Sequence, residues 1–409
     1  MSRHDFQIPV AYTHRIVFTR DAFATGNATL AEILRDGGGR RAIVFIEDSV
    51  AALWPGLVDA VQAYFGNLDL AFCGTAVLPG GEVAKADDAL VRRVWQALDT
   101  ARIDRHSYVL AIGGGAFLDA VGFAAATAHR GVRLVRLPTT TLSQDDGGVG
   151  VKCAINGMGK KNWIGTFAVP FAVINDFEFL RSQDPQTCRA GLIEAVKVAL
   201  VKDAEFFGWI EAHLPALAAL EMGVIEACVE RSALLHARHI ASGGDAFESG
   251  SSRPLDFGHW AAHKLESLTG YEVSHAQAVA VGLALDTLYS ARSGLLATEA
   301  AERILRVLAA LDLASYHPAL AWKDATGRRC IFGGLDEFRQ HLGGQLTVLL
   351  LQDLGVGVNV HHLDETLLDD CIEQLRQRAA DTAALPRRSI HPNHEHEQPQ
   401  DPRRTPATH

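Results

Sequence analysis

The stretch "VLAIGGGAFLDAVGFAAATAHRG" (residues 109–131) decides the fold of the first half of the chain. A run typical of a buried strand passes through three consecutive glycines, Gly113, Gly114 and Gly115, into a helix of small residues. Glycines at such a junction let the backbone amides at the start of the helix come close to a pyrophosphate. The spacing is not GxGxxG, so the glycines alone are equally compatible with a tight turn. The stretch predicts a strand, a turn and a helix that are suited to a dinucleotide.

Similar strand-like runs lie on both sides of this unit. They are "RAIVFIED" (residues 41–48), "VRLVRLPTT" (132–140) and "FAVINDFEFL" (171–180), and helical stretches separate them. This alternation predicts an α/β fold with a largely parallel sheet. From about residue 184 the strand signal fades and long amphipathic helical stretches follow.

We therefore predict three parts of the chain. Residues 1–183 form a Rossmann-like α/β domain, and residues 184–385 form an all-α domain. Residues 386–409 are rich in proline, histidine and charge, which is typical of a disordered tail. The histidines of the tail could bind metal weakly, but a solvated tail is the favoured interpretation.

The composition narrows the class of partner. A net charge of −10 and a pI near 6.0 argue against a nucleic-acid surface, which needs a clustered basic excess. The 6 cysteines are scattered without CxxC spacing, which fits a reducing cytoplasm better than a disulfide framework or a zinc ribbon. No apolar run is long enough to predict a membrane span. Small molecules are the expected partners of a cytoplasmic, two-domain protein.

Three histidines cluster in "LDFGHWAAHKLESLTGYEVSHAQAV" (residues 255–279). His259 and His263 are four residues apart, so they share one face of a helix that Asp256 is expected to cap. A serine-to-glutamine capping box places His275 in the first turn of the next helix. A single histidine is more often structural than functional, but three near one corner favour a site.

A long polar segment, "LPTTTLSQDDGGVGVKCAINGMGKKNWIGTF" (residues 137–167), is denser in glycine than a plain connection requires. Its β-branched and aromatic residues argue for order, so we interpret it as a binding loop. Lys152, Lys160, Lys161 and Asn162 are candidates to hold a phosphate, although surface lysines more often serve solubility.

Two acid–lysine pairs have helical spacing. Glu82 and Lys85 follow a glycine turn, and Glu194 and Lys197 lie in "AGLIEAVK". The ordinary interpretation of each is an i,i+3 ion pair. A carboxylate combined with histidines would alternatively complete a zinc site with three protein ligands and an open position.

Together these stretches resemble the sugar phosphate cyclases, the superfamily of 3-dehydroquinate synthase, over roughly residues 40–365. The glycine triplet with Asp119, "HRGVR", "PTTTLSQDDGGVGVK", "GKKNWIGTF", "GLIEAVK" and "GHWAAH…SHAQAV" occur in the order of that family. The chain is most similar to the dehydroquinate-synthase-like cyclases of Ebo-type gene clusters. This resemblance implies a dinucleotide-binding domain followed by a metal-binding domain.

The resemblance also implies roles for individual residues. Glu194, His259 and His275 look like ligands of Zn²⁺ or Co²⁺, and His263 is similar to the histidine near the leaving phosphate. The residues that resemble the family's NAD site are Asp48, Glu82, Lys85, Gly113, Gly114, Gly115, Asp119, Thr139, Thr140, Asp146, Lys152 and Lys161. The residues that resemble its substrate and catalytic site are Asp146, Lys152, Lys161, Asn162, Lys197, Asp256 and Arg130, the last reaching the neighbouring subunit's site in a homodimer.

The implied reaction is that of a carbon–oxygen lyase. Bound NAD⁺ oxidises a ring hydroxyl of a phosphorylated sugar, phosphate leaves by elimination, and NADH reduces the ketone back. Ring opening and an intramolecular aldol closure then give a carbocycle without net oxidation.

The segment "SSRPLDFGH" (residues 251–259) departs from the pattern of 3-dehydroquinate synthases. Asp256 replaces the family's asparagine, and Arg253 stands three residues before it instead of four. An acid near a substrate carboxylate would repel it. Two further lysines of the family are replaced, one by Arg238 or His239 and one by Gln345.

A weakened carboxylate clamp favours sedoheptulose 7-phosphate as the substrate and a valiolone-type product. The epi-valiolone synthases, however, often carry proline where His263 stands, so neither branch fits fully. Two alternatives are 3-dehydroquinate synthase itself and an iron- or zinc-dependent polyol dehydrogenase. A binding module without catalysis is the third and least favoured.

Overall fold

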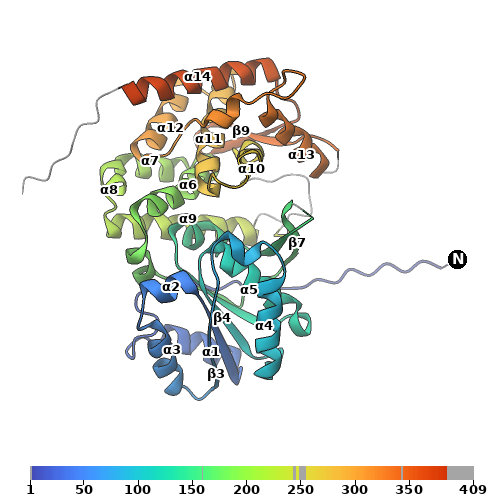
Figure 1. The fold of residues 1–409 in the computed structure, drawn as a ribbon, viewed down its shortest axis with the longest axis vertical. Coiled ribbons are helices and arrows are strands. Elements are labelled where there is room, and N and C mark those ends of the chain that lie inside the picture. The colour runs from blue at the N-terminus through green and yellow to red at the C-terminus, as the bar shows by residue number, and fades with distance from the viewer. Residues whose placement is uncertain (1, 159, 243–245, 248–254, 342–343, 385–409) are drawn as a thin grey trace, which may run out of the picture.

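The structure is a computed structural model that describes residues 2–158, 160–242, 246–247, 255–341 and 344–384. The α/β half and the helical half lie one above the other in Figure 1, with α6 and α9 between them. The predicted tail, residues 386–409, and Arg253 lie outside the described residues.

The first half contains a six-stranded sheet with the order β1-β8-β5-β4-β2-β3. Every neighbouring pair is parallel, which confirms the predicted α/β core. The strands are β1 (Ile16–Thr19), β2 (Arg41–Glu47), β3 (Ala71–Leu78), β4 (Tyr108–Gly113), β5 (Arg133–Pro138) and β8 (Ala172–Asp176).

Helices cover both faces of this sheet. Successive side chains of a strand point to opposite faces, and both sets are buried. Leu110 and Ile112 of β4 pack toward α1 and α3, whereas Val109 and Ala111 pack toward α4 and α5. The helices are α1 (Thr29–Gly37), α2 (Asp48–Leu53), α3 (Leu57–Gly66), α4 (Ala89–Thr100) and α5 (Gly115–Thr127).

The order of the strands reverses between β2 and β4. The chain leaves β2 toward β3 on one side, and it leaves β4 toward β5 on the other. In open α/β sheets a ligand crevice forms outside the carboxyl ends of the strands at such a switch point. Such a crevice is expected beside Glu47 and Gly113, the last residues of β2 and β4.

The second half is mostly helical, but it is not all-α as predicted. After Gln345 the chain forms an antiparallel pair, β9 (Val348–Asp353) and β10 (Val356–Val360), joined through Gly355 at a φ of 77°. A six-residue apolar run does not distinguish a strand from a helix segment, so periodicity missed this pair. The helices are α6 (Pro185–Lys202), α7 (Ala204–Ala212), α8 (Leu214–Ala218), α9 (Met222–Ser242), α10 (His259–Leu268), α11 (His275–Arg292), α12 (Thr298–Ala310), α13 (Gly333–His341) and α14 (Glu365–Ala384).

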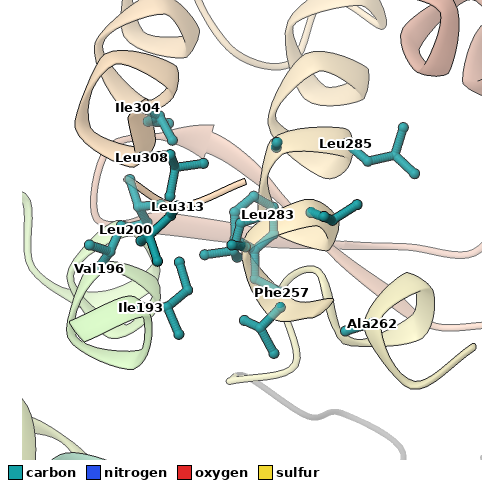
Figure 2. Packing of buried hydrophobic residues seen from close by; sticks show 14 of the residues in the cluster. Ile193, Val196, Leu200, Phe257, Ala262, Leu283, Leu285, Ile304, Leu308 and Leu313 are labelled. Carbon is teal, nitrogen blue, oxygen red and sulfur yellow. The ribbon is translucent and has the colours of Figure 1, made fainter. Parts of the chain in front are cut away.

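One apolar core joins the helices of the second half. Figure 2 shows side chains of α6, α11 and α12 converging in it, among them Ile193, Leu283 and Leu308. The α11 helix is buried on nearly all sides, which holds its first residue, His275, at a fixed place. No helix in the described part of the chain is both long and apolar enough to cross a membrane.

The helices α10 and α11 meet backbone to backbone. A Cβ added at Gly282 would lie 2.1 Å from the carbonyl oxygen of Gly258, and one added at Gly258 would lie 2.6 Å from the amide of Leu283. Gly258, at a φ of 77°, is the N-cap of α10, so the expected side-chain cap from Asp256 is wrong. The capping box predicted for α11 is present.

Replacing Gly282 by alanine tests this contact. The added methyl group forces the two helices apart, and overpacking of this kind costs about 1–3 kcal/mol. We expect a lower unfolding temperature for Gly282→Ala. The control is Gly208→Ala in α7, where an added Cβ meets no atom within 4 Å and alanine favours the helix by roughly 1 kcal/mol. Equal unfolding temperatures of Gly282→Ala and the wild type in a calorimetric scan would contradict the contact.

Candidate functional site

The glycine turn after β4 lies at the switch point of the sheet, where a ligand crevice is expected. Gly114 is the N-cap of α5, no side chain caps that helix, and a Cβ added at Gly115 meets no atom within 4 Å. The amide of Gly114 donates to Oε2 of Glu47 over 2.6 Å, and the amide of Gly81 donates to Oε1 over 2.9 Å. Buried Glu47 therefore ties two glycine turns together at the crevice.

Asp48 was predicted from the sequence, whereas Glu47 was not. Asp48 is exposed, and its Oδ1 accepts from the amide of Gly80 over 3.0 Å, so it also lies at this crevice. The available signal for Glu47 was an acid at the end of an otherwise apolar strand, where burial of a charge demands hydrogen-bond partners.

Lys85 lies beside the same crevice, in the 3₁₀ turn Glu82–Lys85. Its Nζ contacts Oδ2 of Asp119, in α5, at 2.5 Å, and only 4% of Lys85 is exposed. The interpretation of Glu82 and Lys85 as a solvated pair is therefore wrong. Glu82 is exposed; burial disfavours the charge of Lys161, but the charge of Glu266 and then that of Glu82 raise the pKa of Lys161.

Two threonines complete this group. The amide of Thr139 donates to the carbonyl oxygen of Gly113 over 3.1 Å, and the methyl group of Thr140 lies 3.7 Å from the place of a Cβ on Gly114. The structure thus brings together, from four separate segments, these residues predicted for a dinucleotide: Asp48, Lys85, Gly113, Gly114, Gly115, Asp119, Thr139 and Thr140. The open first turn of α5 offers amides and a positive helix end to a pyrophosphate.

Glu194, His259 and His275 lie together in the helical half. One ligand atom from each lies within 4.8 Å of the other two, and the ring centroids of the histidines are 5.5 Å apart. Glu194 projects from the middle of α6 and is 1% exposed, whereas the histidines are the first residues of α10 and α11. The helix contact at Gly258 and Gly282 therefore sets their approach.

The donor chemistry of these three residues fits a divalent metal. Nδ1 of His259 lies 3.1 Å from the carbonyl oxygen of Phe257, and Nδ1 of His275 lies 3.2 Å from Oε2 of Glu266. Each ring thus has its Nε2 left for a metal. Burial lowers the pKa of His259 well below its usual value, which favours the neutral imidazole that a metal ligand requires. Two imidazoles and a carboxylate suit Zn²⁺ or Co²⁺.

His263 lies next to this group rather than within it. Its ring is exposed, and its centroid is 5.4 Å from that of His259 and 5.9 Å from that of His275. His263 also forms a second close group with Glu266 and His275, in which ligand atoms again lie within 4.8 Å of one another. His263 therefore faces the open side of the histidine cluster.

Buried Lys197 links the predicted metal ligands to the polar loop. It forms an ion pair with Glu194, one turn earlier on α6. Burial disfavours its charge, but the carboxylates of Glu194, Asp146 and Asp256 raise the pKa of Lys197 above its usual value. The charged form of Lys197 is therefore favoured, and the predicted Asp146 and Asp256 lie near enough to act on its charge.

Asp146 lies in the π-helical turn Ser143–Gly147, with Oδ1 2.9 Å from Nδ1 of His236. Burial opposes its ionisation, but the charges of His236 and Lys197 hold the pKa of Asp146 well below its usual range. His236, in α9, was not predicted, because His236 and His239 are three residues apart on a long helix with no other site signal. Asp145 was also missed: it is fully buried, and burial, then the charge of Asp146, raises its pKa well above the usual value.

The polar loop ends in a hairpin of β6 (Lys152–Gly157) and β7 (Lys160–Phe167). Nζ of Lys161 contacts Oε1 of Glu266, in α10, at 2.5 Å. Burial opposes the charge of Glu266, but hydrogen bonds from His275 and Lys161 lower the pKa of Glu266 to about 2.

The other two candidates of the hairpin have local contacts. Asn162 adopts a φ of 54°, and its backbone amide donates to Oδ1 of Asn156 over 3.0 Å. Lys160, in contrast, lies over the ring of Trp163, 4.5 Å from its centroid.

Fully buried Arg136, in β5, organises the start of this hairpin. Its guanidinium donates to the carbonyl oxygens of Gly148, Gly150 and Lys152 over 3.1, 2.6 and 3.0 Å, and to the sulfur of Cys153 over 3.0 Å. Sequence reasoning missed this residue, although a charge within an apolar strand was visible. Arg136 thereby fixes the backbone that carries Lys152.

Arg130 does not join the site within one chain. It lies in an exposed 3₁₀ turn, at the end of α5 opposite the glycine turn. The 13 residues of α5 separate the two ends by about 20 Å. Its expected role in a neighbouring subunit stays a prediction, as does the homodimer.

Comparison with known proteins agrees with this geometry. Residues 75–190 match the 3-dehydroquinate synthase N-terminal family, and residues 191–327 match the 3-dehydroquinate synthase C-terminal family. A 3-dehydroquinate synthase of Psychrobacter arcticus is 32% identical over 93% of this chain and 94% of its own length. A 2-epi-valiolone synthase of Actinosynnema mirum is 33% identical over 89% of this chain and 92% of its own.

A solved structure extends the comparison to three dimensions. The 2-epi-5-epi-valiolone synthase from Streptomyces hygroscopicus subsp. jinggangensis, with NAD⁺ and Zn²⁺ bound, superposes with a TM-score of 0.81 at 27% identity. The match covers 92% of this chain and 100% of that one. On the sequence matches and the shared fold, the chain belongs to the 3-dehydroquinate synthase-like family of sugar phosphate cyclases.

Proposed function

We propose that this protein is an NAD- and metal-dependent sugar phosphate cyclase that acts on sedoheptulose 7-phosphate and forms a valiolone-type carbocycle. Asp256, in place of the asparagine of 3-dehydroquinate synthases, carries the choice of substrate. The choice of cofactors rests on the crevice at Gly114 and on the group Glu194, His259 and His275.

The residues at the two cofactor sites would hold the groups that carry out the chemistry. When bound, NAD⁺ would accept and return a hydride, and a divalent metal would polarise a substrate oxygen. Glu194, His259 and His275 would hold the metal, and the first turn of α5, with Lys85 and Asp119, would hold the dinucleotide. This pairing has support in the Streptomyces relative, which was solved with both groups.

Lys197 would serve the substrate's oxygens as a fixed donor. Its raised pKa keeps the ammonium charged, so it stabilises negative charge that develops on an oxygen beside it. Asp256, which stands where 3-dehydroquinate synthases carry asparagine, acts on the charge of this ammonium, and it would repel a substrate carboxylate placed there. An uncharged-headed ketose phosphate avoids that repulsion.

The phosphate would lie on the opposite, basic side. Lys152 and Lys161 belong to the hairpin, and His263 faces the exposed side of the histidine cluster. Their side chains can donate hydrogen bonds to phosphate oxygens and stabilise the leaving group. In a homodimer, Arg130 of a second copy would add a further positive charge.

The second candidate is 3-dehydroquinate synthase, because several similar curated relatives carry that name. In that case Arg253 or Arg238 would still hold the substrate carboxylate. A polyol dehydrogenase would differ from both in accumulating NADH.

The choice of substrate is tested by phosphate release from the metal-loaded protein with NAD⁺. We expect release from sedoheptulose 7-phosphate and none from the carboxylated substrate of 3-dehydroquinate synthase, with the carbocycle identified by NMR. Release from the carboxylated sugar alone would refute the substrate choice. Stoichiometric NADH formation with a polyol would refute the cyclase itself.

The metal ligands are tested by His275→Ala. Because this change removes one of three ligands, we expect loss of the tightly bound metal after dialysis, measured by elemental mass spectrometry. His106→Ala, at an exposed position before β4, is the control and should keep its metal. Unchanged metal content in His275→Ala would rule out this ligand set.

The dinucleotide site is tested by Asp119→Asn. The change leaves buried Lys85 without its carboxylate, and loss of a charged hydrogen bond corresponds to roughly ten-fold or more weaker NAD⁺ binding. Titration calorimetry of NAD⁺ into the metal-loaded protein measures this. Asp99→Asn, on the exposed side of α4, should bind NAD⁺ like the wild type. If the two variants bind NAD⁺ equally well, the assignment is wrong.

A further inference from the structure

Glu266 is a buried acid that none of the site assignments uses. It lies seven residues after His259 on α10, on the face that His259 and His263 share, and it is 2% exposed. A charge that deep in a protein requires hydrogen-bond partners. The two carboxylate oxygens of Glu266 have different ones, which come from separate parts of the chain.

The first partner is the predicted metal ligand His275. Oε2 of Glu266 lies 3.2 Å from Nδ1 of His275. A carboxylate at Nδ1 fixes the proton on that nitrogen, which leaves the lone pair on Nε2 and makes it a stronger donor to a metal. The carboxylate also restricts rotation of the ring.

The second partner is Lys161 of the β6–β7 hairpin. Its Nζ lies 2.5 Å from Oε1 of Glu266. Because each oxygen serves one partner, replacing Lys161 leaves the oxygen that contacts His275 in place to do so. The pair also fastens the hairpin of the first half to α10 of the second half.

We propose that Glu266 is a positioning residue of the metal centre, which orients His275 for the metal through Nδ1. This inference rests on the proposed function, because it assumes that Glu194, His259 and His275 bind the metal. Glu266 acts through His275 and is not itself a ligand.

Two other roles make different predictions. If Glu266 served only to hold Lys161 in place, replacing Glu266 would change the metal affinity no more than replacing Lys161 does. As a direct ligand in the group with His263 and His275, Glu266 would be required for the coordination sphere. Metal affinity and the spectrum of bound Co²⁺ separate these roles without any need for turnover.

The experiment measures the Zn²⁺ affinity of the metal-stripped full chain by competition with a chromogenic chelator. We expect 10–100-fold weaker binding in Glu266→Ala, as is typical when the outer partner of a metal-bound histidine is lost. Glu266→Gln, which is isosteric but uncharged, should weaken binding less. The unfolding temperature of Glu266→Gln, compared with that of the wild type, shows whether the variant is folded.

The matched control is Glu337→Gln. Glu337 lies on the exposed side of α13. Its Oε1 pairs with Nζ of Lys264 at 2.6 Å, and Lys264 lies on α10, the helix that also carries Glu266. Glu337→Gln and Lys161→Met should both bind Zn²⁺ as tightly as the wild type. An equal loss of affinity in Lys161→Met and Glu266→Gln would overturn the proposed route through His275.

The Co²⁺-loaded proteins decide whether Glu266 is a ligand. We expect the visible absorption bands of Glu266→Gln to match those of the wild type, since the ligand set is unchanged. Altered bands would overturn the positioning role. Equal Zn²⁺ affinity in the wild type and both Glu266 variants would overturn this inference alone, whereas failure of the wild type to bind metal would overturn the proposed function as well.

Discussion

The close contact between Gly258 and Gly282 is the constraint on which the second half of the site depends. Because neither position carries a Cβ, the start of α10 lies directly against the middle of α11. Buried Asp286 fastens this contact, since it accepts from the amide of Gly258 and from Nε1 of Trp260, each over 2.9 Å. The separation of His259 from His275 is therefore set by backbone packing and not by the side chains alone.

The first half of the site follows a different logic. It uses the carboxyl ends of β2 and β4, where the sheet changes direction and no strand continues. Glycine turns keep this edge open, and Glu47 satisfies their amides. Lys197 interacts with charges of both halves. It forms an ion pair with Glu194 of α6, and the charge of Asp146, in the polar loop, raises the pKa of Lys197.

Much of this organisation could be predicted from the sequence, because it depends on local patterns. The glycine triplet, the parallel strands and the capping box before His275 each have a signature within a few residues. The strand pair β9–β10 was missed, since a short leucine-rich run has no distinctive period.

The partners of buried charges could not be predicted in the same way. Glu47 and Glu266 bond to groups that lie far away in the sequence, and Arg136 bonds to the loop that follows its strand; no spacing rule connects any of them to their partners. Their charge inside apolar stretches was visible, but their partners depend on the folded chain. Resemblance to a family identified residues expected to touch ligands, and it left out those that hold such residues in place.

Arg136 illustrates what this means for altering the enzyme. Among the described residues no carboxylate forms an ion pair with it, so its charge is balanced by the carbonyl dipoles of the polar loop. A lysine could not replace it, because an ammonium lacks the planar fork that reaches several acceptors at once. The conformation of the loop therefore depends on the arginine at position 136. Exchanging the loop between relatives requires that both be transferred, although Arg136 lies in β5 and precedes the loop.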